Sequence, residues 1–345
     1  MSSDIERYSC QIKLPDFGIN TQKKLKDAKV LIIGAGGLGC PVLQYLVSSG
    51  IGSIGIADDD RVSASNLHRQ ILYSPEDIGK LKVDVAQEKL QEQNPEVKFI
   101  VFPEKVDSAN ILNMIDLFDI IVDGTDNFET KNLINDACVL SKKPWVYGAI
   151  YQYEGQVSSF NVLQNDGNFS PNYRDLFPDS DYAEVPDCRE GGVIPTLAGV
   201  IGCMQANEVI KYFSDPEKMF AGKLWLINLQ DGATRTIRFK SNPQNIIKGL
   251  QQTISVVDFE EFKKRYEKFE LIDVREEKER KTFNIGGKHI PLDELKNNID
   301  NIDLSLPVLC YCMSGKRSLH AAKQIQSAFP AAQIFSLKNG IQDMI

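Results

Sequence analysis

A glycine-rich turn after an apolar run is the first stretch of this sequence whose residues could bind a ligand. Residues 30–33 predict a buried parallel strand, and Gly34, Gly36 and Gly39 follow it with the G-x-G-x-x-G spacing. Glycines at these positions let the backbone turn tightly and approach a phosphate, whose charge is also favoured by the N-terminus of the following helix. The spacing therefore predicts a nucleotide site, but NAD, FAD and ATP sites all share it.

Charged residues further along the chain help to distinguish between these nucleotides. Asp58 follows the next expected strand, residues 51–57, where a carboxylate commonly accepts hydrogen bonds from ribose hydroxyls. Residues 65–70 then place two amides and an arginine in one loop, and Lys80 and Lys82 are expected to open a helix. Hydride transfer does not need so many cations, whereas attack on a triphosphate does, because charge accumulates on the departing pyrophosphate. Taken alone, the two lysines would instead indicate a solvated helix face.

A second polar cluster, residues 123–127, follows the expected strand at residues 118–122. Open α/β sheets bind ligands at the carboxyl ends of their parallel strands, so Asp126 is a candidate magnesium ligand. Asp126 or Asn127 could also cap the helix that begins near Phe128, and the two roles are compatible.

The remaining elements of this half predict a mixed sheet. Strands are expected at residues 97–102, 145–149 and 156–162, the last of them antiparallel, and at residues 224–229 and 234–239. The last two flank Asp231-Gly232, which is a hairpin signal. A long helix is expected at residues 196–213.

Length and composition indicate two or three soluble domains. The chain has 345 residues, of which 42% are hydrophobic and 25% charged. Its net charge of −8 argues against nucleic acid as a partner. The longest uncharged run, residues 191–207, contains Pro195 and is read as a buried helix, so no membrane span or signal peptide is expected. Seven cysteines without a paired framework suit a reducing cytoplasm.

Cysteines at two places could act as nucleophiles. Cys188 lies among charged residues ahead of the helix at residues 196–213, where Arg189 and the helix start favour a thiolate. Cys312 opens a strand-to-helix loop in which backbone N–H groups, Lys316 and Arg317 would stabilise a thiolate or a persulfide anion. The other cysteines in apolar segments are expected to be small core residues; they are Cys40, Cys138, Cys203 and Cys310.

The motifs of the first half together resemble the ubiquitin-activating-type adenylyltransferases of the MoeB/ThiF/HesA group. The matching stretches GAGGLG, DDD, SNLHRQ, Lys82, TDN and CREGGVIPTLAGVIG occur in order over residues 4–240. The resemblance implies a Rossmann-like ATP-binding adenylation domain with a mixed sheet, which forms a homodimer. It also implies adenylation of the C-terminal carboxylate of a small ubiquitin-like sulfur-carrier protein ending in Gly-Gly.

The resemblance assigns Asn66, Arg69 and Lys82 to the phosphates of ATP and Asp126 to Mg²⁺. It makes Cys188 a conjugating cysteine that meets the acyl group of the carrier. The residues expected to contact ATP are Gly34, Gly36, Gly37, Gly39, Asp58, Ser65, Asn66, Leu67, His68, Arg69, Gln70, Lys82, Asp126 and Asn127.

The sequence departs from the family pattern in two places. Two zinc-binding C-x-x-C pairs are usual, one near residues 172–175 and one just after Asn242-Pro243, and both are absent here. Because structural zinc needs thiolate or imidazole ligands, no zinc site is expected. Cys10 stands where related sequences often carry an arginine that reaches the partner subunit's ATP, and Arg7 or Lys13 are the candidate replacements.

The C-terminal part, residues 253–345, resembles a rhodanese domain. The stretches LIDVREEKE, GGKHIPL and CMSGKRS carry the match, and strands are expected at residues 254–257, 269–274 and 308–312. By this resemblance Cys312 bears a persulfide, whereas Asp273 and His289 support the loop. The remaining residues of the persulfide loop are Met313, Ser314, Gly315, Lys316 and Arg317.

The two resemblances divide the α/β chain into an adenylation domain at residues 1–240, a linker at 241–252 and a small α/β rhodanese domain at 253–345. Together they predict an ATP-dependent adenylyltransferase and sulfurtransferase that makes a protein thiocarboxylate. The sulfur donor would be a cysteine desulfurase or thiosulfate. The downstream pathway stays open between molybdopterin, thiamine, cysteine and tRNA thiolation.

Two other functions compete with this prediction. An NAD-dependent oxidoreductase would explain residues 34–58 but would leave Arg69, Lys82, Asp126 and the sulfur loop without a role. A non-catalytic carrier-binding scaffold is suggested by Cys10 and by the missing zinc thiols, although the other phosphate and metal residues of the family pattern are present.

Overall fold

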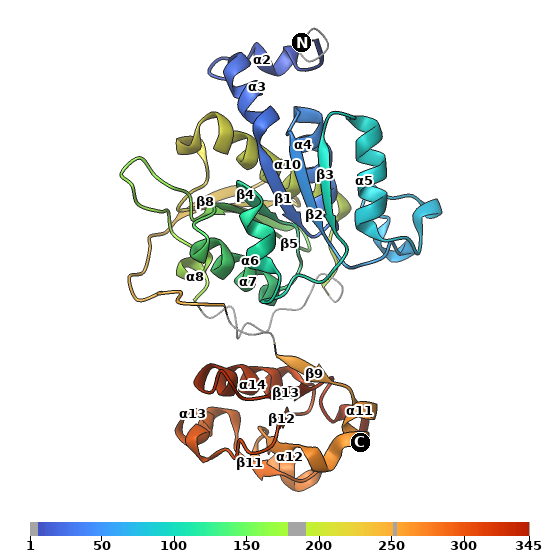
Figure 1. Cartoon of the computed structure of the whole chain (residues 1–345), viewed down its shortest axis with the longest axis vertical. Coiled ribbons are helices and arrows are strands. Elements are labelled where there is room, and N and C mark those ends of the chain that lie inside the picture. Colours follow the sequence, from blue (N-terminus) through green and yellow to red (C-terminus); the bar gives the residue numbers. More distant parts are fainter. Residues whose placement is uncertain (1–5, 179–190, 251–253, 345) are drawn as a thin grey trace. The chain divides into compact units, whose positions relative to one another are not determined.

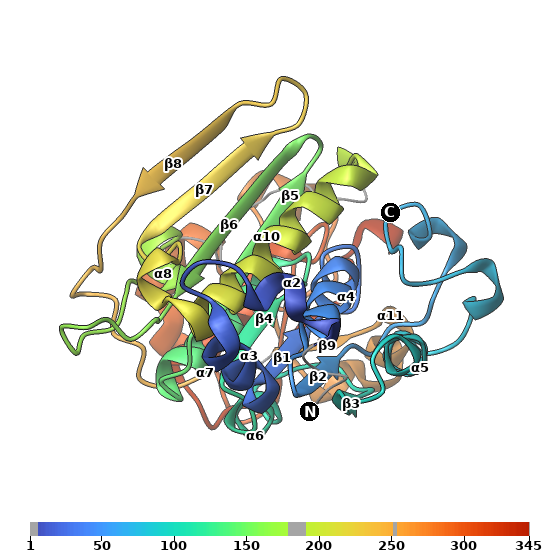
Figure 2. The same ribbon diagram turned by 90° about the horizontal axis from the view of Figure 1, so that it is seen from above.

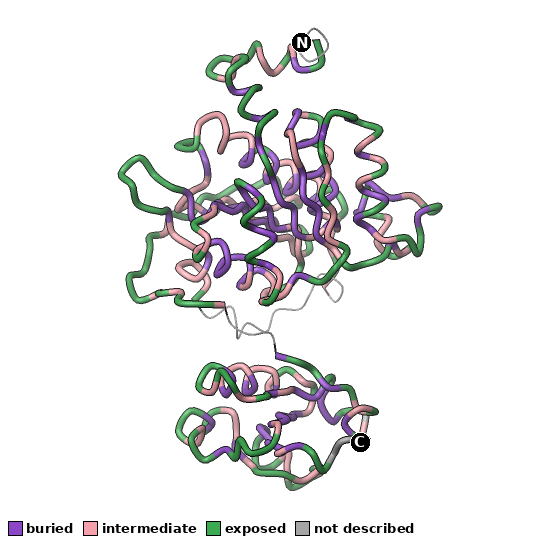
Figure 3. Tube along the Cα trace, viewed as in Figure 1, coloured by how far each residue is buried: buried purple, intermediate pink, exposed green. Residues whose placement is uncertain are grey.

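The computed structural model describes residues 6–178, 191–250 and 254–344. The chain forms two compact units, Met1–Leu250 and Gln251–Ile345. Each unit has its own sheet and its own buried core, which the burial colouring of Figure 3 makes visible. None of the helices among the described residues is a candidate for a membrane-spanning segment.

An eight-stranded mixed sheet organises the first unit (Figure 1). Its strands are β1 (Lys29–Ile33), β2 (Ser53–Ala57), β3 (Lys98–Phe102), β4 (Ile120–Asp123), β5 (Trp145–Tyr151), β6 (Glu154–Phe160), β7 (Lys223–Asn228) and β8 (Thr234–Arg238). The strand order is β3-β2-β1-β4-β5-β6-β7-β8, with parallel pairing up to β5 and antiparallel pairing from β5 to β8. The parallel half thus brings the carboxyl ends of β1, β2 and β4 to one edge, as the sequence predicts.

Helices cover both faces of this sheet, because its central parallel strands are apolar on both sides. Figure 2 shows α4 (Gly39–Ser49) and α10 (Pro195–Ser214) on one face of the sheet and α6 (Ile111–Asp116) on the other. Val30 and Ile32 of β1 enter the core with α4, α5 (Lys82–Gln93) and α10, whereas Leu31 and Ile33 enter the core with α6 and α7 (Phe128–Leu140). The helices are α2 (Ser9–Ile12), α3 (Gly18–Asp27), α4 (Gly39–Ser49), α5 (Lys82–Gln93), α6 (Ile111–Asp116), α7 (Phe128–Leu140), α8 (Tyr173–Leu176) and α10 (Pro195–Ser214).

The second unit is a five-stranded parallel sheet with helices around it. Its strands are β9 (Ser255–Val257), β10 (Glu270–Asp273), β11 (Lys288–His289), β12 (Val308–Tyr311) and β13 (Ile334–Leu337), in the order β11-β10-β12-β13-β9. Its helices are α11 (Phe259–Arg265), α12 (Glu277–Thr282), α13 (Leu295–Asn298) and α14 (Lys316–Ala328). The loop that begins at Cys312 therefore joins the end of β12 to the start of α14.

Most element bounds agree with the sequence-based prediction, but the helix expected to open at Lys80 is an exception. α5 begins only at Lys82, because residues 75–77 form a 3-10 turn and Gly79 adopts a positive φ of 87°. Lys80 precedes the helix, and its ammonium pairs with Asp77 Oδ1 at 3.3 Å. Of the two lysines, only Lys82 is therefore placed by the helix.

Candidate active sites

The glycine turn between β1 and α4 is closed by backbone contacts that exclude side chains. A Cβ atom on Gly34 would lie 2.7 Å from the carbonyl carbon of Gly124, and one on Gly39 would lie 2.0 Å from Gly34 O. Gly34 also has a positive φ of 95°, which glycine adopts without strain. The turn is therefore held directly against the loop that follows β4.

Gly36 and Gly37 differ from Gly34 and Gly39, since no backbone atom crowds them. A Cβ atom on Gly36 would meet only the side-chain amide of Gln70, at 3.4 Å. A Cβ atom on Gly37 would approach the side chains of Arg69 and Ala198 at 3.5 Å. The structure thus brings the exposed part of the turn beside two residues of the predicted phosphate-binding loop.

Asp58 lies at the end of β2 and joins the same turn. Its Oδ2 accepts a hydrogen bond from Ala35 N at 2.7 Å, and its Oδ1 accepts one from Asp60 N at 2.8 Å. Burial raises the pKa of Asp58, although the charge of Lys82 and the two backbone amides oppose the shift. A carboxylate that is fixed at this strand end can accept hydrogen bonds from a ribose, which is the predicted role.

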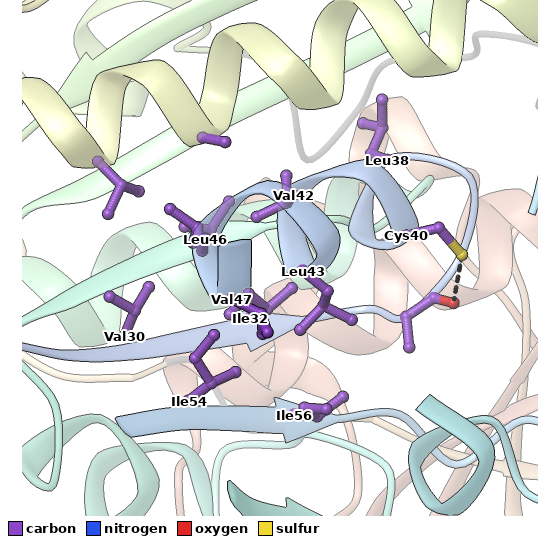
Figure 4. Packing of buried hydrophobic residues seen from close by; sticks show 14 of the residues in the cluster. Val30, Ile32, Leu38, Cys40, Val42, Leu43, Leu46, Val47, Ile54 and Ile56 are labelled. Atoms are coloured by element: carbon purple, nitrogen blue, oxygen red, sulfur yellow. Dashed lines mark hydrogen bonds between the residues drawn. The ribbon is translucent and has the colours of Figure 1, made fainter. Parts of the chain in front are cut away.

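A buried support beneath the turn was missed by the sequence analysis. Tyr73 donates its hydroxyl hydrogen bond to Ala35 O at 2.7 Å, and the Cys40 thiol points at the same carbonyl from α4 (Figure 4). Burial raises the pKa of Cys40 to about 12, so its thiol stays protonated at neutral pH. Burial also raises the pKa values of Cys138 and Cys310, and these three cysteines match the predicted core role.

The loop at residues 65–70 is held by short-range hydrogen bonds. Asn66 Oδ1 accepts from Ser63 Oγ at 2.9 Å, and the backbone carbonyl of Asn66 accepts from the amides of Arg69 and Gln70. Leu67 packs its side chain partly against the core, and His68 Nδ1 lies 3.0 Å from Ser65 O. The side-chain oxygen of Gln70 is buried without a partner among the described residues, so this amide could still accept a hydrogen bond.

Lys82 reaches the site from the first turn of α5. Its side chain is buried, and Nζ donates to Asp60 Oδ2 at 2.7 Å, while the Asp60 carboxylate is itself mostly exposed. Asp58, Asp59 and Asp60 are the one set of three or more potential metal ligands that lie close together in the described part of the chain. The pair with Asp60 holds Lys82 at the edge of the sheet where Asp58 lies.

Asp126 and Asn127 follow β4, and the structure separates their two predicted roles. Asn127 is the N-cap of α7, because its Oδ1 accepts from Thr130 N at 2.8 Å. Asp126 is exposed, and its carboxylate has no hydrogen-bond partner among the described residues. A magnesium ion is commonly bound by one or two carboxylates together with substrate phosphates, so a single free carboxylate fits this ion.

A buried ion pair under the Asp126 loop is the second feature that the sequence analysis missed. Lys131 of α7 donates to Asp123 Oδ2, and also to the backbone carbonyls of Thr125 at 2.9 Å and Gly148 at 3.0 Å. Gln205 of α10 donates to Asp123 O at 2.7 Å. These bonds tie the segment that carries Asp126 to strand β5 and to helix α10.

We expect Lys131→Met to destabilise the first unit by about 3–5 kcal/mol, because the Asp123 carboxylate would stay buried without its cation. Both tryptophans, Trp145 and Trp225, lie in this unit, so denaturant unfolding followed by tryptophan fluorescence measures the change in its free energy. Lys105→Met is the matched control, since Lys105 is exposed. Equal midpoints for the two variants would show that the buried pair contributes nothing to stability.

Hydrogen bonds join the two segments in which zinc-binding cysteines are usual. Asp175 Oδ1 accepts from Asn242 N at 2.9 Å and from Asn245 Nδ2 at 3.0 Å, and its Oδ2 accepts from Asn172 N at 2.9 Å. Asn245 Nδ2 also donates to Arg174 O at 3.1 Å. These amide and carboxylate groups do not fit structural zinc, which takes thiolate and imidazole ligands.

We therefore expect the purified protein to contain no stoichiometric zinc and to keep its thermal midpoint in the presence of a chelator. Asp175→Ala should instead lower the free energy of unfolding by about 1–3 kcal/mol, because three donors lose their acceptor, among them Asn172 N in the capping box of α8. Asp231→Ala is the control, since Asp231 accepts one bond in an exposed turn. Elemental analysis that found about one zinc per chain would contradict this account.

Two further predictions concern the N-terminus and the second nucleophile. Cys10 is exposed on α2, whereas Arg7 donates to Gln93 O of its own chain at 3.3 Å. Of the two candidate replacements for the missing arginine, only Lys13 thus has a side chain without a hydrogen bond among the described residues. Cys188 lies in residues 179–190, outside the part of the chain that the structure describes.

In the second unit, Cys312 is buried where β12 ends and its loop begins. Its Sγ accepts a hydrogen bond from Gly315 N at 3.2 Å and lies 3.6 Å from Ser318 Oγ. Gly315 has a positive φ of 87° and is the N-cap of α14, so the N-terminus of that helix faces the sulfur. This arrangement favours an anion on sulfur.

The side chains in and near this loop differ in their exposure. Ser314 and Lys316 are exposed, and Arg317 is half-buried. Asp273 accepts two hydrogen bonds from the fully buried Arg275, a partner that the sequence analysis did not single out. His289 Nε2 lies 2.8 Å from Arg275 O, so Asp273 and His289 both contact Arg275.

The ThiF family model matches residues 8–247, which is more than half of the chain. The chain belongs to the ThiF family. A rhodanese-like domain model matches residues 258–344 of this ThiF-family protein. The two matches fall on the two compact units.

Two relatives and one solved structure show what this chain is similar to. The sulfur carrier protein adenylyltransferase of Thermus thermophilus is 43% identical over 261 residues, which cover 75% of this chain and 96% of that protein. The probable adenylyltransferase/sulfurtransferase MoeZ of Mycobacterium tuberculosis is 33% identical, and the match covers 94% of this chain and 89% of MoeZ. The crystal structure of E. coli MccB, 24% identical, has the same fold, with a TM-score of 0.58 over 67% of each chain.

This ThiF-family protein is therefore an adenylyltransferase and sulfurtransferase, and its family uses ATP as the nucleotide. The mixed sheet and the Rossmann-like fold agree with the sequence-based prediction. The family match also removes the oxidoreductase reading of the glycine turn.

Proposed function

We propose that the first unit adenylates the C-terminal glycine carboxylate of a small ubiquitin-like sulfur-carrier protein. The observation that carries this proposal is the meeting of the glycine turn with Asp58, Arg69, Gln70 and Lys82 at one sheet edge. A carboxylate oxygen of the carrier attacks the α-phosphorus of ATP, and the bond from that phosphorus to pyrophosphate breaks. Arg69 and Lys82 stabilise the negative charge on the departing pyrophosphate.

Magnesium would be held by Asp126 and by the phosphates of ATP, and it would neutralise phosphate charge during the attack. Lys131 acts on this step indirectly, because it fixes the loop that carries Asp126 through Asp123 and Thr125. Asn127 keeps the same loop in place as the cap of α7.

We further propose that Cys312 carries the sulfur as a persulfide. The persulfide anion attacks the carbonyl carbon of the acyl adenylate, AMP leaves, and an acyl disulfide joins the carrier to Cys312. A second thiolate then attacks the Cys312 sulfur, which releases the carrier as a thiocarboxylate and forms a protein disulfide. Cys188 is the candidate for this second thiol, or alternatively for the acceptor of the acyl group.

A homodimer formed through the adenylation unit is part of the proposal. Packing within the chain requires a glycine at only one of two positions on α10. A Cβ on Gly202 would collide with Pro41 at 2.4 Å, whereas one on Gly199 would meet nothing within 4 Å. Gly199 therefore leaves room for a close approach from outside. Sedimentation of the active enzyme as a monomer would exclude the dimer.

ATP–pyrophosphate exchange tests the proposed function. Exchange should require a carrier of the ubiquitin fold that ends in Gly-Gly, and a carrier without its last glycine should not support it. If the protein were only a carrier-binding scaffold, it would bind the carrier but would not catalyse any exchange. That outcome would overturn the catalytic proposal and leave the scaffold.

A further inference from the structure

The guanidinium of Arg317, in the persulfide loop, is held by a carboxylate from another element. Its Nη1 and Nη2 donate to Glu279 Oε2 and Oε1 at 2.7 and 2.6 Å. Glu279 belongs to α12, and its Oε2 also accepts from Glu276 N at 3.0 Å as part of that helix's capping box. The carboxylate is thus positioned by its own helix, and it occupies the end of the guanidinium formed by Nη1 and Nη2.

The pair is ionised throughout the neutral range. The hydrogen bond with Arg317 lowers the pKa of Glu279 to about 2, and the same bond raises the pKa of Arg317. Two other arginines of this unit are paired with a different carboxylate, that of Asp273. Arg275 donates to both oxygens of Asp273, and Arg280 pairs with Asp273 at 3.3 Å. Lys316 is the remaining cation of the loop, and its side chain is exposed.

We propose that Glu279 is a specificity-determining residue that withdraws Arg317 from the sulfur donor and so selects a persulfide over thiosulfate. The inference rests on the proposed role of Cys312 as the persulfide carrier. Thiosulfate is a dianion, and its sulfonate oxygens match the bidentate donor geometry of an arginine fork. A persulfide, R–S–SH, presents no such oxyanion to the loop, so it loses nothing when Arg317 is engaged.

Both donors would load the same sulfur by the same displacement. The Cys312 thiolate attacks the outer sulfur of R–S–SH, the donor S–S bond breaks, and RS⁻ leaves with the electron pair and takes up a proton as RSH. With thiosulfate the leaving group is sulfite. The two reactions differ in the charge of the donor group that must approach the loop. Glu279 acts on this difference, because it holds the arginine that would bind the thiosulfate dianion.

The decisive variant is Glu279→Gln, which keeps the size of the side chain but removes its charge. Loading of Cys312 is followed by mass spectrometry with thiosulfate and, in parallel, with glutathione persulfide as the probe. We expect kcat/KM for thiosulfate to rise about tenfold, mainly through KM, as one charge-assisted hydrogen bond becomes available to the sulfonate. The value for glutathione persulfide should stay within about twofold.

Glu277→Gln is the matched control, because it removes the same charge from the same helix without touching Arg317. Glu277 pairs instead with Lys281 at 3.1 Å and with His289 at 3.2 Å. The double variant Glu279→Gln/Arg317→Ala should lose the gain. A similar rise in the Glu277 variant, a gain that survives in the double variant, or no rise at all would each overturn the proposal.

Arg317→Lys keeps the proposal testable even where the Glu279 variant folds poorly. The lysine retains the charge but has no fork, so thiosulfate loading should match that of the unaltered protein. A large loss would show that Arg317 already binds thiosulfate, and the proposal would fail. Loading of Cys312→Ala by either donor would instead contradict the persulfide assignment of the proposed function.

Discussion

Asp126→Ala should slow ATP–pyrophosphate exchange by about 100- to 1,000-fold, the usual effect of removing one preorganised charge-stabilising group. The reason is that the Asp126 carboxylate, in the loop after β4, is available to bind a metal ion, whereas the carboxylate of nearby Asp123 is paired with Lys131. Without it the metal would be bound through phosphates alone, and the phosphate charge would be poorly neutralised. Exchange measured over a range of magnesium concentrations should show a weaker apparent affinity for the metal in this variant.

The fold should survive this change, because the Asp126 side chain is exposed and makes no hydrogen bond among the described residues. Glu129→Gln is the control: it removes one negative charge three residues later, in the first turn of α7. This variant should exchange pyrophosphate at the normal rate. A normal rate in Asp126→Ala, or equal losses in both variants, would remove Asp126 from the metal site.

The glycine turn and the ends of its strands could be predicted because their signals are local. A buried strand, a close turn and a helix start lie within residues 30–47, and the period of the apolar residues gives the face of each element. The capping role of Asn127 is also a local property, which is why both of its possible roles could be stated in advance.

The support of the site could not be predicted, because it depends on partners that are distant in sequence. Lys131 bonds to Gly148 O and Gln205 bonds to Asp123 O, across separations of 17 and 82 residues. In a sequence, Lys131 is simply a lysine inside a helix, and only the fold shows that it is buried. The one available signal was its place in the first turn of α7, five residues after the predicted magnesium ligand.

The same limit explains Asp175 and Glu279. The absence of cysteines at residues 172–175 was readable, but the hydrogen bonds from Asn242 and Asn245 in its place join segments 67 and 70 residues apart. Glu279 and Arg317 are 38 residues apart and lie in different helices. The sequence analysis therefore overestimated the positive charge available in the persulfide loop. A sequence shows how many cations the loop has, but it does not show which carboxylates pair with them.

The structure also makes the two activities separable, since Cys312 and the nucleotide turn belong to different compact units. Adenylation needs phosphate ligands and no thiol, whereas sulfur transfer needs a persulfide. Cys312→Ala should therefore abolish persulfide formation and thiocarboxylate production, yet leave ATP–pyrophosphate exchange unchanged. Cys188→Ala should also keep exchange but accumulate adenylate and make little thiocarboxylate, if Cys188 takes the acyl group or closes the disulfide that releases the product.

Cys310→Ala is the matched control for the loss at Cys312, because it removes a thiol two residues earlier, within β12. Cys310 is fully buried in the core, and burial raises its pKa, so it cannot supply a thiolate at neutral pH. Its loss should cost about 1 kcal/mol of stability and leave sulfur transfer intact. Mass spectrometry of the carrier is the deciding measurement, because the thiocarboxylate replaces one oxygen with sulfur. Normal thiocarboxylate formation by Cys312→Ala, with no sulfide added, would mean that the rhodanese unit is not the source of the sulfur.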